Sequence, residues 1–179
     1  GFMIAIHLAL GACNSTIKEK SMSVYLFILP WSIDSLGGVS QVVQNLLFQM
    51  ERKGVYKPIL MVNSWDDRIV RKEKIQNIDH LFFRIRSIYN RKRPVKNLFA
   101  YLFFLEIFKL HRFLKNHKVS VVNIHYCGLY ALNFCILKAL RLFKGKLILS
   151  FHGNFVFTSP DNDIISKLLW KLLLRASDW

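Results

Sequence analysis

Short apolar runs alternate with amphipathic segments along most of this chain, and that alternation limits the folds open to it. Runs typical of buried strands occupy residues 23–31, 56–64, 80–87, 119–125 and 145–153. Segments with helical periodicity occupy residues 39–53, 94–117, 129–143 and 163–176. Strands that alternate with helices favour a parallel sheet, because parallel neighbours need a crossover connection. We therefore expect an α/β fold with helices on both faces of a parallel sheet.

Two segments need separate treatment. Residues 65–77 are polar and lack a clear period, which favours a loop or a short helix. The stretch from Pro94 to His117 contains no breaker, so it predicts one long helix. Charged residues such as Glu106 and Lys109 interrupt its apolar part, so a membrane-spanning helix is not expected.

Composition adds limits on partners and compartment. The 179 residues suffice for one domain with a buried core, and 26 Lys and Arg against 11 Asp and Glu give a formal net charge of +15. This charge attracts polyanions, anionic lipid or phosphorylated small molecules, and does not choose among them. Cys13, Cys127 and Cys135 lack paired spacing, so we interpret them as reduced cysteines of a cytoplasmic protein and expect no zinc site.

The two ends of the chain differ from its middle. A short apolar run ending at Cys13 is too short to span a bilayer and lacks the basic start of a signal peptide. We expect a disordered or non-native extension over residues 1–21 and one domain over residues 22–179. The chain reaches Trp179 just after a helical segment, without a polar tail, which indicates truncation of a longer protein.

Three candidate site segments each follow a predicted strand. They are the Gly37–Gly38 turn, His125 and His152. Because the carboxyl ends of parallel strands meet at one edge of a sheet, we expect these segments to lie together there, where such sheets bind ligands.

The glycine pair precedes a helical segment. Glycines allow backbone N–H groups to approach a phosphate, and a helix N-terminus carries partial positive charge. The sequence around Gly37 and Gly38 is neither GxGxxG nor a P-loop, so a purely structural turn stays open as the alternative.

The two histidines have a chemical and a structural interpretation. A neutral imidazole at His125 or His152 can hydrogen-bond a sugar hydroxyl or stabilise a leaving phosphate. Alternatively, each is a rim histidine satisfied by the backbone. Residues 153–163 follow as a candidate ligand-contacting loop. The remaining histidines lack partners at ligand spacing, so we expect no metal site.

A basic cluster occupies residues 84–96 and leads into the apolar segment that starts at Pro94. Basic and aromatic residues together over 84–115 favour contact with an anionic membrane surface, and a solvated loop is the alternative. Nucleic acid is not expected as a partner, because no recognition module accompanies the charge.

Four segments in this order resemble the N-terminal domain of the retaining glycosyltransferases of family 4, which have the two-domain GT-B architecture. The resemblance runs from about Ser23 to the end of the chain. The segments are LPWSIDSLGGVSQVVQNLLFQMERKG, KVSVVNIHYCGLYAL, KLILSFHGNF and LLWKLLLRASDW. It implies a Rossmann-like sheet, the N-terminal half of a GT-B enzyme, and transfer of a sugar from a nucleotide-sugar to an acceptor.

The resemblance also implies roles for single residues. Gly37 and Gly38 would face the donor diphosphate and sugar, and His125 would contact the reacting sugar as the catalytic residue. On the acceptor side it places His152, Gly153 and Asn154. The family's usual acidic residue and first histidine on this strand are here Ser120 and Asn123, which are mild departures.

The family's donor-binding second domain has no counterpart in these residues, so the resemblance implies that the fragment is inactive alone. It implies no metal and no cofactor besides the nucleotide-sugar substrate. We expect a role in cell-surface polysaccharide or glycolipid synthesis, with a sugar or lipid-linked acceptor, in the cytoplasm or on the inner face of the plasma membrane. The alternative is a non-catalytic Rossmann-like module that binds a phosphorylated ligand or an anionic membrane surface.

Overall fold

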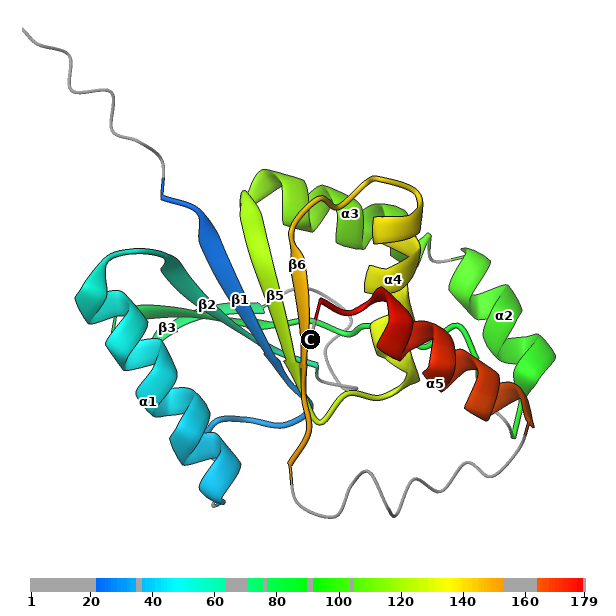
Figure 1. The fold of residues 1–179 in the computed structure, drawn as a ribbon, viewed down its shortest axis with the longest axis horizontal. Helices are drawn as coiled ribbons and strands as arrows, with labels where there is room; N and C mark the ends of the chain where they lie inside the picture. Colours follow the sequence, from blue (N-terminus) through cyan, green and yellow to red (C-terminus); the bar gives the residue numbers. More distant parts are fainter. Residues whose placement is uncertain are drawn as a thin grey trace, which may run out of the picture.

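The computed structural model of the chain describes residues 22–34, 37–63, 71–75, 77–89, 92–103, 105–152 and 164–178. A six-stranded sheet has the order β3-β4-β2-β1-β5-β6 (Figure 1). The strands are β1 (Val24–Leu29), β2 (Lys57–Val62), β3 (Arg71–Ile75), β4 (Ile78–Phe82), β5 (Val119–His125) and β6 (Lys146–Ser150). The helices are α1 (Gly38–Lys53), α2 (Pro94–Phe103), α3 (Glu106–Asn116), α4 (Leu132–Ala139) and α5 (Ile164–Ala176), with a 3₁₀ turn at Leu129–Ala131.

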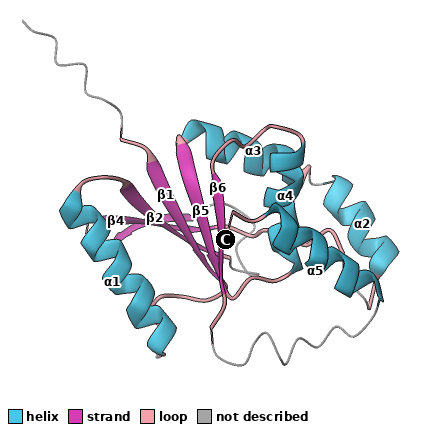
Figure 2. Cartoon of the chain, in the orientation of Figure 1, coloured by secondary structure: helices cyan, strands magenta, loops and turns pink. Residues whose placement is uncertain are grey.

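All neighbouring strands pair in parallel except β3, which lies antiparallel to β4 at one edge. The helices form a layer on each face of the sheet, as Figure 2 shows with α1 on one side and α3, α4 and α5 on the other. The predicted Rossmann-like parallel sheet with helices on both faces is therefore confirmed.

Alternation along β1 explains the two layers. Leu26 and Ile28 belong to the core under α3, α4 and α5, whereas Phe27 and Leu29 pack with Val43 of α1 on the other face. Successive side chains of a strand point to opposite faces, so an uninterrupted apolar run is required for a strand covered on both sides. The apolar run at residues 23–31 meets that requirement.

The polar segment at residues 65–77 was predicted to be a loop or short helix, and over residues 71–75 that prediction is wrong. Residues 71–75 form β3, which pairs with β4 along its whole length. Lys72 of β3 lies 3.3 Å from the carboxylate of Asp79 on β4, and the Arg71 guanidinium lies over the Phe82 ring. A strand at the sheet edge can stay polar because one of its sides faces solvent.

The single long helix predicted from Pro94 to His117 is also wrong. Two helices, α2 and α3, are separated at Leu105, whose φ of 48° lies in the left-handed region. The break orients α3 so that it buries Glu106, which is 6% exposed and pairs with Arg86 at 3.2 Å between Nε and Oε1. No glycine or proline marks Leu105 in the sequence, so local propensity did not predict the break.

The bounds of three further elements are shorter than predicted. Residues 80–87 were expected to be a strand, but β4 ends at Phe82. Residues 129–143 begin as a 3₁₀ turn, and α4 ends at Ala139. The strand predicted over residues 145–153 ends at Ser150 as β6. The strand over residues 119–125 matches β5.

Candidate functional site

The two predicted site histidines meet at the carboxyl edge of the sheet. His125 is the last residue of β5 and pairs in register with Ser150, the last residue of β6, so that His152 lies two residues beyond that strand. Nδ1 of His125 lies 2.8 Å from Nε2 of His152, and the two rings stack with their centroids 5.1 Å apart. The hydrogen bond requires one ring to donate and the other to accept.

The His125 ring lies almost fully inside the protein. It is 2% exposed and stacks on Phe27 of β1 at a centroid distance of 6.0 Å. Burial, with a further contribution from His152, lowers the pKa of His125 from 6.5 to about 4. Burial also lowers the pKa of His152. Both imidazoles are therefore neutral at physiological pH, and one hydrogen bond fixes their relative orientation.

The second ring nitrogen of His125 is unusual. Nε2 is buried and finds no hydrogen-bond partner among the described residues. Most buried polar atoms are hydrogen-bonded, and leaving one unsatisfied costs on the order of 1–3 kcal/mol. A ligand hydroxyl would satisfy this atom, which makes Nε2 the part of the edge best suited to a polar ligand.

The buried histidine predicts acid sensitivity. The unfolded chain takes up a proton at His125 near pH 6.5, whereas the folded protein does so only near pH 4. The stability contributed by neutral His125 is complete above pH 6.5 and is lost as the pH falls toward 4, at up to about 1.4 kcal/mol per pH unit. Urea unfolding between pH 4.5 and 7.5 measures the free energy of unfolding of wild type and of His125→Gln. That free energy should fall less steeply with decreasing pH in the variant, and equal pH dependence would show that His125 is not the group responsible.

Aromatic residues extend the site in a direction that sequence reasoning missed. The Tyr126 ring lies between Trp31 and His152, at centroid distances of 4.6 and 5.2 Å. Trp31 Nε1 donates to Ser40 Oγ in the first turn of α1, at 3.3 Å. These contacts connect the histidine pair to the start of α1. An aromatic residue close behind each of two adjacent strands was the signal available in the sequence.

The glycine pair lies at the start of α1. Gly37 is the N-cap residue and Gly38 the first helical residue; neither has a side-chain cap, and the first turn holds no acidic residue. Both glycines are exposed, and a Cβ added at either position would meet nothing within 4 Å. Packing does not require glycine at either position, so the open backbone leaves room for a ligand to approach the helix N-terminus.

The structure gives Asn123 a supporting role. Its Oδ1 accepts a hydrogen bond from Ser150 Oγ at 2.8 Å, and its Nδ2 donates to the Tyr25 hydroxyl at 3.2 Å. Asn123 thus links β5 to both neighbouring strands, two residues before His125 and on the same face of the sheet. Gly153 and Asn154, the other two predicted site residues, lie outside the described residues.

The described part of the chain contains no group of three or more His, Cys, Asp or Glu side chains that could hold a metal ion. Cys127 and Cys135 are free and buried, and burial raises their pKa values to about 12 and about 11. Such thiols stay protonated and do not act as nucleophiles at physiological pH.

The basic cluster at residues 84–96 is partly structural. Arg86 pairs with buried Glu106, so this cation supports the start of α3. On α2 the apolar side chains of Val95, Leu98 and Phe99 are exposed beside Lys96, with Phe99 67% exposed. In the described ranges no helix has the length and apolar character needed to cross a bilayer.

Comparison with known proteins assigns the chain to a family. The model of Glycosyltransferase Family 4 matches residues 36–179. Among solved structures, one similar chain is titled "Trehalose-6-phosphate from E. coli bound with UDP-2-fluoro glucose", with 12% sequence identity and a TM-score of 0.48. The match covers 87% of this chain and 39% of that one, so this chain spans well under half of that protein's length. No curated protein sequence matched.

Proposed function

This chain belongs to glycosyltransferase family 4, and from that premise we propose that it forms the acceptor-side domain of an enzyme that transfers a sugar from a nucleotide-sugar to an acceptor. The observation that supports this proposal most is the joint position of His125, His152 and the open start of α1 at the carboxyl edge of the sheet. Ligands of parallel α/β sheets bind at that edge.

In this proposal His125 is the catalytic residue. Its Nε2, which has no partner among the described residues, forms a hydrogen bond with a hydroxyl of the reacting sugar. The bond to His152 couples the two ring nitrogens of His125. If Nδ1 donates to His152, Nε2 is the acceptor, and if Nδ1 accepts, Nε2 is the donor. A neutral imidazole at physiological pH suits either role, because a hydroxyl both donates and accepts.

The other predicted residues complete the site around His125. Gly37 and Gly38 admit the donor diphosphate to the N-terminus of α1, whose first turn carries no acidic side chain to repel it. His152, only partly buried, lies on the acceptor side of His125, with Gly153 and Asn154 following it in the sequence. No metal is required by this arrangement.

The finer activity is part of the same proposal. The transfer is of the retaining hexosyltransferase type and serves cell-surface polysaccharide or glycolipid synthesis at the inner face of the plasma membrane. Support for the membrane comes from the net charge of +15 and from the exposed apolar side chains beside Lys96 on α2. Such a combination binds anionic bilayer surfaces.

The experiment is a transfer assay on the full-length protein. Release of nucleoside diphosphate is followed with a panel of nucleotide-sugars, in the presence of vesicles that contain lipid extract as a source of acceptor. We expect release with at least one donor, and none from residues 1–179 alone, because the donor-binding domain that the family resemblance implies has no counterpart in these residues. Saturable nucleotide-sugar binding without any turnover would favour the non-catalytic binding module instead.

A further inference from the structure

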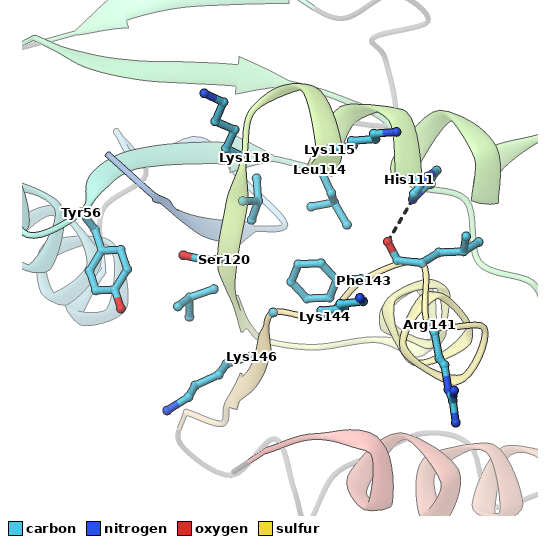
Figure 3. Close-up of a pocket in the computed structure, with 14 residues that line it drawn as sticks. Tyr56, His111, Leu114, Lys115, Lys118, Ser120, Arg141, Phe143, Lys144 and Lys146 are labelled. Atoms are coloured by element: carbon cyan, nitrogen blue, oxygen red, sulfur yellow. Dashed lines mark hydrogen bonds between the residues drawn. The ribbon is translucent and has the colours of Figure 1, made fainter. Parts of the chain in front are cut away.

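A large pocket lies at the opposite edge of the sheet from the histidine pair. It has a volume of about 830 Å³ and is formed where α3 and α4 end and where β5 and β6 begin (Figure 3). Because β5 and β6 run from this pocket to His125 and Ser150, the two sites lie at opposite ends of the same strands. The proposed sugar transfer makes no use of this pocket.

The pocket carries one sign of charge. Fourteen residues line it, including five Lys or Arg residues and one histidine, and none of the fourteen is Asp or Glu. Its basic side chains are His111, Lys115, Lys118, Arg141, Lys144 and Lys146. Within the described part of the chain, Lys115, Arg141 and Lys144 form no ion pair. Positive charge without counterions favours an anionic ligand.

The nearby carboxylate of Asp178 does not neutralise this charge. It lies close enough to Lys146 for the two charges to interact, but it is already bound by two other groups. Its Oδ2 accepts a hydrogen bond from the backbone N–H of Leu147 at 2.6 Å and from Lys138 at 2.5 Å. Lys138 is not a lining residue, so Asp178 is held on the α4–α5 side of the pocket.

The floor of the pocket is apolar and firmly held. Figure 3 places the Phe143 ring at its centre, with Leu114 beside it and the charged ends of Lys115, Lys118, Lys146 and Arg141 arranged around it. Phe143 and Leu114 are buried, at 5% and 2% exposed. The five cations are exposed, so the pocket combines a cationic rim with an apolar floor.

One hydrogen bond fixes the loop that carries the floor. The His111 Nδ1–H of α3 donates to the backbone carbonyl of Leu142, at 3.1 Å. A carbonyl can only accept, so Nδ1 carries the proton. The loop between α4 and β6 is thereby held against α3 before any ligand arrives.

Two of the cations occupy strained backbone positions. Lys118 and Arg141 follow the ends of α3 and α4 and have φ values of 52° and 57°. Glycine is the usual residue in this left-handed position after a helix, because side chains are disfavoured there. Two explanations for the cations are open. If they bind a ligand, glycine at these positions weakens ligand binding, and if they only interact favourably with the helix dipole, glycine leaves ligand binding unchanged.

We propose that this pocket binds an organic phosphate, with the phosphate groups on the cationic rim and the organic part over Phe143. Arg and Lys on the rim supply charge-assisted hydrogen bonds to phosphate oxygens. The pocket is too large for a single inorganic phosphate, and the apolar floor needs an apolar ligand part to cover it. A soluble nucleotide and the headgroup of an anionic phospholipid share this chemistry.

The test compares two charge-matched double variants of the purified protein. Arg141→Gly with Lys144→Ala removes two rim cations, and Lys167→Ala with Lys171→Ala removes two exposed cations of α5. ADP binding is measured by calorimetry at 150 mM salt, with pyrophosphate as the probe that lacks an organic part. Flotation with vesicles containing phosphatidylglycerol tests the lipid source.

We expect the rim variant to lose at least about tenfold in affinity for ADP or for the vesicles, which corresponds to about 1.4 kcal/mol. The α5 variant should lose less than about twofold. The melting temperature of Arg141→Gly should stay equal or rise, because glycine relieves the left-handed strain, so misfolding does not explain the loss. Binding of ADP alone identifies a soluble ligand and binding of vesicles alone a headgroup, and both support the pocket. Equal losses in the two variants, no binding of either probe, or pyrophosphate binding as tightly as ADP would overturn the proposal.

Discussion

Replacing His125 with alanine should lower sugar transfer by the full-length protein by about 100-fold or more, the range expected when an acid–base or hydrogen-bonding group of the transition state is removed. The substitution removes the buried Nε2 that has no partner among the described residues, and with it the bond proposed to form with the reacting sugar. It also removes the partner that orients His152. The effect should appear in kcat, because the bond is proposed to strengthen in the transition state.

Two further variants make this prediction specific. His111→Ala, at the opposite edge of the sheet, should leave transfer within about twofold of wild type, a difference below about 0.5 kcal/mol. His152→Ala should cause a smaller loss than His125→Ala, because it removes the orienting bond but keeps Nε2. Melting temperatures separate activity loss from unfolding. Transfer by a folded His125→Ala at more than half the wild-type rate would remove His125 from the reaction.

Substituting Gly145 with alanine should lower the free energy of unfolding by about 2–3 kcal/mol, as overpacking in a tight core does. A Cβ at this position would lie well inside contact distance of the Phe143 ring and of the backbone carbonyl oxygen of Ser120 on β5. The carbonyl belongs to the central strand β5, and the pairing of the adjacent residues Val119 and Val121 with β1 restricts its movement. The loop that forms the floor of the basic pocket would have to shift.

Gly38→Ala is the matched control for that prediction. A Cβ at Gly38 would meet nothing within 4 Å, and the residue begins α1, so alanine should be neutral or slightly stabilising there. Urea denaturation followed by circular dichroism measures both variants. Equal stability of the two would show that the Phe143 loop adapts without cost, contrary to the close approach at Gly145.

The sequence predicted those parts of the fold whose patterns come from burial on two faces. The run at residues 119–125 became β5 within the same bounds, and the helix predicted over residues 39–53 is α1, which begins one residue earlier and has Gly54 as its left-handed cap, at φ 63°. The edge strand β3 was missed because an exposed edge needs no apolar pattern. The break at Leu105 was missed because no glycine or proline marks it, and the Arg86–Glu106 pair beside it joins residues far apart in the chain.

The same limit applies to the sites. That His125 and His152 approach one another followed from parallel strand ends, but their direct hydrogen bond depends on the register of β5 with β6. The stack of Trp31 on Tyr126 depends on the loop after β1, which no periodicity describes. The basic pocket gathers the ends of two helices and the starts of two strands, and its cations are spread over residues 115–146. The family prediction, by contrast, rests on sequence segments and is confirmed over residues 36–179.

The most direct test of the sugar-transfer site is an NMR titration of the full-length protein with ¹⁵N-labelled histidine, read as nucleotide-sugar is added. The imidazole signals of His125 and His152 should shift together, because a ligand bound at Nε2 of His125 changes the hydrogen bond between the rings. The signal of His117, whose ring is hydrogen-bonded to the backbone carbonyl of Phe113 away from this edge, should stay in place. Saturable binding that leaves His125 and His152 unshifted would contradict the assignment of this edge as the transfer site.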